Sequence, residues 1–163
     1  MKYAKVFKKF NINSHITLHL LPYDVENQGY LDLLNEAKNS GLSQVIINSE
    51  IMLDFLSYTV ENEGIILKIK LNDYADEELE NDIMYIVGKL RKEKGLFEDL
   101  KKSLSWALDS ESIDITSITV AFRLDDMSTY SWEIFSNGII VGENIDEFFY
   151  KYLYNVIGEY LNG

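Results

Sequence analysis

The chain of 163 residues contains no cysteine, one proline and two histidines. The absence of cysteine excludes a disulfide framework, a thiolate metal site and a cysteine nucleophile. No stretch approaches the roughly 18 to 20 apolar residues of a membrane span. The lysines of the N-terminus are not followed by the apolar stretch of a secretory signal. We therefore predict a cytoplasmic protein that does not bind membranes.

Common motifs of catalysis and cofactor binding are also missing. The nine glycines are scattered, and neither G-x-G-x-x-G nor G-x-x-x-x-G-K-[ST] occurs, so no phosphate-binding loop is indicated. No G-x-S-x-G nucleophile elbow is present. We predict no cofactor and no catalytic residue of these classes.

His15 and His19 are four residues apart. In a strand they would share a face but lie about 13 Å apart, too far for one zinc ion with bonds of roughly 2.0 to 2.1 Å. A magnesium-dependent nuclease is also disfavoured, because Ile66 stands where the E-x-K pattern needs a glutamate after Asp54. We predict no metal site. Dispersed carboxylate pairs remain open as a route to catalysis.

Acidic charge is the most unusual feature that is present. The chain has 27 acidic and 15 basic residues, a net charge of −12, and 47% of its residues are hydrophobic. This composition supports a single folded domain, residues 1–163, and argues against disorder. A negative field repels nucleic acid and anionic lipid and attracts basic partners, although plain solubility explains it equally well.

Hydrophobic periodicity predicts the elements of the first half. Tyr3, Val6, Phe7 and Phe10 have helical spacing and favour a short amphipathic helix packed on its own domain over a strand, a membrane-surface anchor or a docking peptide. Further along we predict strands at 15–21 and 45–47, with a helix between them that ends at Gly41. A hairpin is predicted from strands at 53–60 and 65–71, with Ile65, Leu67, Ile69 and Leu71 facing the core and Lys68 and Lys70 facing water.

The second half begins with two predicted helices. Acids crowd the start of the first helix, from residue 73, and bases crowd its end, as the helix dipole favours. A second helix is predicted at 96–108, followed by a loop at 109–112. Strands are then predicted at 113–122, 130–135 and 139–141. A tight turn at Asn137-Gly138, with two positive φ angles, is predicted to join the last two. The last helix opens at Asn144 and has one broad apolar face.

These elements predict an α+β fold. We expect a mainly antiparallel sheet of about five to seven strands, helices packed on one face, and a C-terminal β-hairpin followed by a helix. Residues 53–92 and 115–162 share a weak likeness that indicates either a duplicated β-β-α unit or chance similarity.

The acidic loops and the aromatic strand at 130–135 offer a candidate interface for a basic protein. Trp132 is expected in the core. The predicted interface residues are Asp109, Glu111, Asp114, Asp125, Asp126, Tyr130 and Glu133. We predict an inhibitor or immunity-type protein that covers the cationic site of a basic toxin or nucleic-acid-handling enzyme. The alternatives are an enzyme that uses dispersed carboxylates and a self-associating structural module, for example through an N-terminal helix.

Overall fold

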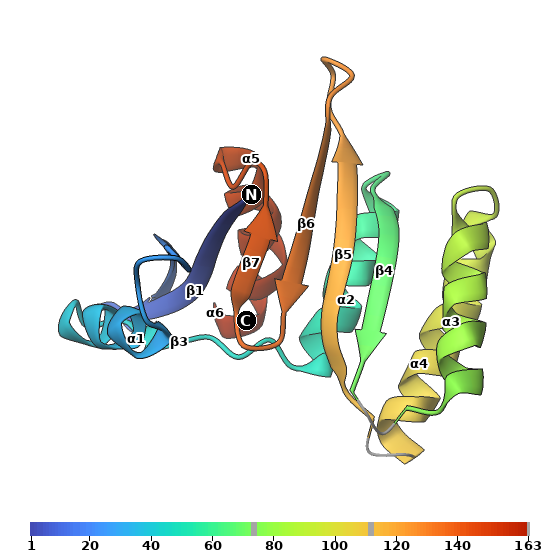
Figure 1. Cartoon of the computed structure of the whole chain (residues 1–163), viewed down its shortest axis with the longest axis horizontal. Coiled ribbons are helices and arrows are strands. Elements are labelled where there is room, and N and C mark those ends of the chain that lie inside the picture. The colour runs from blue at the N-terminus through green and yellow to red at the C-terminus, as the bar shows by residue number, and fades with distance from the viewer. Residues whose placement is uncertain (73–74, 111–112, 163) are drawn as a thin grey trace.

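The computed structural model describes residues 1–72, 75–110 and 113–162. Seven strands form one antiparallel sheet in the order β2-β1-β7-β6-β5-β4, with β3 paired to β1 (Figure 1). The strands are β1 (Lys2–Phe10), β2 (Ile16–Pro22), β3 (Ser43–Gln44), β4 (Ile65–Leu71), β5 (Ile115–Arg123), β6 (Thr129–Phe135) and β7 (Ile139–Gly142). The predicted α+β class with a mainly antiparallel sheet is confirmed.

The helices pack mainly on one face of this sheet. They are α1 (Tyr30–Asn39), α2 (Ser49–Glu61), α3 (Glu77–Leu90), the 3₁₀ turn η1 (Lys94–Leu96), α4 (Phe97–Ser110), α5 (Glu147–Leu153), the π-helical segment η2 (Tyr154–Gly158) and α6 (Glu159–Asn162). The last three run without a break and are called the C-terminal helix below. Residues of α2, α3, α4 and the C-terminal helix share one large hydrophobic cluster with the sheet.

Among the helices of the described residues, α1 alone packs on the opposite face. Val6 belongs to the large cluster, whereas its neighbour Phe7 packs with Leu33 and Ala37 of α1 in a small second cluster. Successive residues of a strand point to opposite faces, so β1 separates the two clusters. In Figure 1, α1 lies beside β1 and β3, away from β4 and β5.

The strand predicted at 15–21 and the helix ending at Gly41 are both present, and Gly41 has a φ of 75°. The two middle helices, the strands of the second half and the hairpin followed by the C-terminal helix are present as well. Asp76 caps α3, because its carboxylate accepts a 2.7 Å hydrogen bond from the Leu79 amide.

The predicted N-terminal helix is wrong. Residues 2–10 form β1, which pairs with β2, β3 and β7. The helical spacing arose because a strand buried on both faces carries apolar residues on both, so it does not show simple alternation. The N-terminal helix given as an example for the self-association alternative is therefore not present at residues 2–10.

The predicted hairpin at 53–71 is half wrong, because residues 53–60 lie in α2. The amide of Ile51 donates a 2.9 Å hydrogen bond to the capping side chain of Asn48, and the buried residues that follow keep helical spacing. Gly64 is needed for close approach, since a Cβ there would lie 2.6 Å from the ring of Phe122. The segments 53–92 and 115–162 therefore do not share an order of elements.

Three smaller predictions need correction. A register shift between Ile66 and Lys68 makes Ile66 a core residue and leaves Ile65 on the other face, although Ile69 and Leu71 are buried as predicted. The short strand predicted at 45–47 lies at 43–44 instead. At the Asn137-Gly138 turn only the glycine has a positive φ, 84°.

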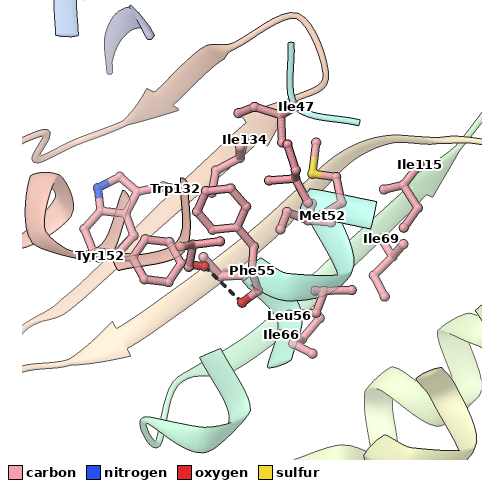
Figure 2. Packing of buried hydrophobic residues seen from close by; sticks show 14 of the residues in the cluster. Ile47, Met52, Phe55, Leu56, Ile66, Ile69, Ile115, Trp132, Ile134 and Tyr152 are labelled. Carbon is pink, nitrogen blue, oxygen red and sulfur yellow. Dashed lines mark hydrogen bonds between the residues drawn. The ribbon is translucent and has the colours of Figure 1, made fainter. Parts of the chain in front are cut away.

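Aromatic rings fill the centre of the large cluster. Trp132 is 1% exposed, as predicted for a core residue, and its indole donates a 2.6 Å hydrogen bond to the carbonyl of Asn144. Figure 2 shows Tyr152 beside Phe55 of α2, and the Tyr152 ring also stacks on that of Trp132. The hydroxyls of Tyr152 and Thr59 lie 2.8 Å apart, and Thr59 donates to the Phe55 carbonyl at 2.7 Å. These buried hydroxyls are therefore satisfied.

Candidate functional site

The predicted interface residues do not form one surface. Asp125 and Asp126 lie at the tip of the β5–β6 hairpin, and Asp109 and Asp114 lie near the other end of β5 (Figure 1). Because β5 spans nine residues, the two groups are roughly 30 Å apart. Glu111 lies outside the described residues.

Several of these residues have local structural roles. The Asp126 carboxylate accepts hydrogen bonds from the amide and hydroxyl of Ser128, which lower its pKa and stabilise the turn. Asp114 accepts a 3.1 Å hydrogen bond from Ser49 at the start of α2. Glu133 accepts a 3.0 Å bond from Ser117 on the sheet face opposite the large cluster.

Tyr130, the remaining predicted residue, is half-buried. Its ring meets Trp132 edge-on, with the ring centroids 6.2 Å apart. The predicted set is therefore spread over a hairpin tip, a helix end and a sheet face. A different group of residues comes together in the fold.

An acidic groove lies between α2 and the C-terminal helix. Asp54 and Glu61 line it from α2, and Glu159 lines it from α6. Lys101 of α4 is the cation among the residues that line this groove, whose volume is about 650 Å³. At neutral pH the groove therefore has an excess of negative charge and room for a side chain of a partner.

Asp54 is the perturbed carboxyl of this groove. Loss of solvation raises the pKa of Asp54, and the negative charge of Glu50 raises it further, whereas Lys101 lowers it. A carboxylate in this state gains more from a cationic ligand than a fully solvated one does, because the ligand replaces missing solvation. Asp54 is therefore the carboxylate most suited to contact a bound cation.

An aromatic pocket adjoins the acidic groove. It has a volume of about 290 Å³ and is lined by the rings of Tyr58, Phe122, Phe148 and Tyr152, together with Asn62, Lys151 and Asn155. Tyr58 and Asn155 line both the pocket and the groove. The two cavities are therefore neighbours that share one wall.

That shared wall is fixed by a hydrogen bond. The Asn155 side chain donates to the Tyr58 hydroxyl at 2.8 Å, although the two residues are 97 positions apart in the chain. The Tyr152 hydroxyl is directed inward to Thr59. Both tyrosines of the pocket have hydroxyls engaged with other residues, so the pocket wall is mainly ring surface.

The π-helical segment shapes this region. Tyr154–Gly158 interrupts the α-helical geometry of the C-terminal helix, and its residues Asn155 and Val156 line the groove. Single π-helical turns occur often at functional sites. A Cβ at Gly158 would lie 2.9 Å from the ring of Tyr154, so a larger residue there would require that ring to move.

A third cavity, of about 680 Å³, lies where β1 and β2 meet the loop before α1. Its walls include Lys2, Asp24 and Glu26. The Asp24 carboxylate already accepts hydrogen bonds from the side chain and amide of Asn27 and from the amide of Glu26, and these bonds lower its pKa. Since Asp24 serves the turn and Lys2 offsets the charge, this cavity is less suited to a cation.

The structure brings no metal-binding cluster together among the residues that it describes. His19 contacts the Thr17 hydroxyl at 3.1 Å, and His15 is exposed just before β2. Within the described ranges, none of the helices is long and apolar enough to cross a membrane.

The sequence did not predict the acidic groove or the aromatic pocket, because residues 53–60 were expected in a strand. The available signal was the spacing of Asp54, Tyr58 and Glu61, which puts them on one side of a helix. The partners from the C-terminal helix gave no signal, since contacts between distant segments are made only by the fold. Comparison of the chain with models of protein families, with curated protein sequences and with solved structures found no match in any of the three.

Proposed function

We propose that the protein binds a basic segment of a partner protein in the acidic groove and acts as an inhibitor or immunity-type protein. The observation that supports this most directly is the convergence of Asp54, Glu61 and Glu159 from two helices on one groove. The net charge of −12 adds long-range attraction for a basic toxin or nucleic-acid-handling enzyme. The cytoplasmic location and the hairpin-tip acids Asp125 and Asp126 stay predictions within this proposal.

The chemistry of the groove matches a lysine or arginine side chain. Its carboxylates accept charge-assisted hydrogen bonds, and the Tyr58 and Tyr160 rings offer apolar surface to an aliphatic stem. An exposed acid elsewhere on the chain would contribute only to steering. Groove carboxylates would also contribute to the lifetime of the complex, because they are partly desolvated when the partner is bound.

The test compares two triple variants with equal changes of charge. One variant is Asp54→Asn with Glu61→Gln and Glu159→Gln. The control is Asp82→Asn with Glu93→Gln and Glu143→Gln, three exposed residues that do not line the groove. Affinity for a short lysine- and arginine-containing peptide is measured by calorimetry from 20 to 500 mM salt.

We expect the groove variant to lose about tenfold in affinity, the sum of several weak ion pairs, and the control to lose much less. Wild-type affinity should also fall with salt, because screening weakens attraction between charges. Equal losses in the two variants, or binding without salt dependence, would contradict the proposal. Capture of partners from a cell lysate by the wild type and not by the groove variant would then identify the natural ligand.

One observation favours the second candidate, an enzyme that uses dispersed carboxylates. The raised pKa of Asp54 is a feature of general acids and bases, which need values nearer to neutral pH. If the groove catalysed hydrolysis, Asp54→Asn would abolish turnover of a substrate without weakening its binding. If the groove only binds, the same variant weakens binding and there is no turnover to lose.

A further inference from the structure

Within the proposed binding function, we infer that the aromatic pocket takes an aromatic side chain of the partner, next to the basic side chain held by the acidic groove. The partner segment would therefore combine an aromatic residue with a neighbouring lysine or arginine. This inference names the chemistry of the partner and rests on the function proposed above.

The first support is the lining of the pocket. The ring of Tyr152 lies 5.5 Å from that of Tyr58 and 5.2 Å from that of Phe122, and Phe122 meets Phe148 edge-on at 5.7 Å. Phe122 and Tyr152 are almost fully buried and back the pocket. Another ring would therefore pack on the exposed part of Phe148 and on the half-buried Tyr58, in the offset and edge-on arrangements that aromatic pairs prefer.

The second support is size. A cavity of roughly 150 Å³ lined by apolar side chains can hold benzene. The aromatic pocket has a volume of about 290 Å³ and is therefore large enough for one phenyl or phenol ring. Phe148 is 38% exposed although it is a large apolar residue, so its ring has surface that a partner can cover.

The third support is the charge difference between the two cavities. Lys151 is the charged residue that lines the aromatic pocket, whereas the acidic groove has three carboxylates and one ammonium group. A cation is therefore favoured in the groove and an uncharged ring in the pocket. Because Tyr58 and Asn155 separate them, adjacent side chains of one peptide can reach both.

The inference can be tested with four dipeptide probes. They are the N-acetyl amides of Phe-Arg, Ala-Arg, Phe-Gln and Ala-Gln. Binding is followed by the fluorescence of Trp132, whose ring stacks on Phe148 with the centroids 5.9 Å apart. The second tryptophan, Trp106, is 61% exposed and is replaced in all proteins by Trp106→Phe, so that one reporter remains.

In this background we expect Phe-Arg to bind about tenfold more tightly than Ala-Arg, as burial of most of a phenyl ring requires. Phe148→Ala should remove that difference. The matched control is Tyr150→Ala, on the same helix and 36% exposed, and it should preserve the difference because Tyr150 does not line the pocket.

The outcomes separate this inference from the proposed function. Equal binding of Phe-Arg and Ala-Arg, or a preference that survives Phe148→Ala, would overturn the aromatic anchor. If arginine still strengthened binding in that case, the groove would keep its proposed role. If phenylalanine strengthened binding and arginine did not, the cationic partner would be wrong while the pocket remained a site for aromatic side chains. The comparison of the four peptides on the Trp106→Phe background leaves every pocket residue unchanged, so it does not depend on the folding of Phe148→Ala.

Discussion

The two hydrophobic clusters lie on opposite faces of the sheet and differ in how their buried polar groups are compensated. In the large cluster, the hydroxyls of Thr59 and Tyr152 bond to each other and to the Phe55 carbonyl. The small cluster under α1 lies beside Lys5, which is 0% exposed. Among the described residues, Lys5 has no carboxylate within salt-bridge distance.

The buried charge of the Lys5 ammonium is less well compensated than the buried hydroxyls of the large cluster. It donates a hydrogen bond to the Asn137 carbonyl and lies 5.6 Å from the centroids of the Phe7 and Tyr30 rings. Burial lowers the pKa of Lys5 from 10.5 to about 8. The two hydroxyls of the large cluster are paired with each other, whereas the small cluster lies beside an amine whose charge depends on pH.

The largest effect is expected in the large cluster. Trp132→Ala should lower the free energy of unfolding by about 3 to 5 kcal/mol, because it leaves a cavity among several rings and removes the hydrogen bond to Asn144. Urea unfolding followed by circular dichroism measures this loss. A loss below about 1 kcal/mol would show that this cluster is not the main source of stability.

A smaller loss of stability is expected from a substitution in the small cluster under α1. Leu33→Ala should lower the free energy of unfolding by about 2 to 3 kcal/mol, since Leu33 is fully buried but the small cluster has fewer neighbours to lose. Hydrogen exchange should show faster exchange confined to α1 and β3. If Leu33→Ala destabilised the chain more than Trp132→Ala, the ranking of the two clusters would be reversed.

The buried amine predicts a dependence on pH. Below pH 8, Lys5 is protonated in both states, and the folded state bears the full cost of burying the charge. Between pH 8 and 10 the unfolded chain keeps a proton that the folded chain releases, so the free energy of unfolding should rise by about 2 kcal/mol at 1.36 kcal/mol per unit.

Lys5→Met provides the reference for this measurement. The variant cannot titrate at this position, so the rise should appear as a difference between the two unfolding curves from pH 8 to 10. Comparison with the variant also cancels the contribution of Tyr152, which both proteins share. Burial raises the pKa of Tyr152, so its contribution favours folding below pH 10 and is lost above it in both proteins. Parallel curves would mean that the folded protein does not release the Lys5 proton in this range.

The smallest effect concerns the paired hydroxyls. Thr59→Val should cost about 1 kcal/mol, because the Tyr152 hydroxyl can still donate to the Phe55 carbonyl, 3.3 Å away. Thermal unfolding measures the change. A loss of more than about 3 kcal/mol in the free energy of unfolding would indicate that Tyr152 is left without adequate compensation. The contrast between the two clusters would then be weaker.

Local patterns predicted the elements with a strong one-sided periodicity. The acids at the start of α3 and the bases at its end, for example, identified that helix from residues close in sequence. The failures were β1 and α2. β1 carries apolar residues on both faces, so it shows no simple alternation. The buried residues of α2 do keep helical spacing, but its apolar run at 53–60 also fits a strand. An apolar run of this kind does not distinguish a helix from a strand.

The α+β class, the core position of Trp132 and the surplus of negative charge could be predicted before the fold was known, because each follows from composition or from the spacing of nearby residues. Tertiary structure alone decided the position of the acidic groove, the aromatic pocket and the buried amine of Lys5. Those sites join residues such as Tyr58 and Asn155, and a contact across 97 positions depends on how the helices pack on the sheet. Local spacing carries no information about that packing.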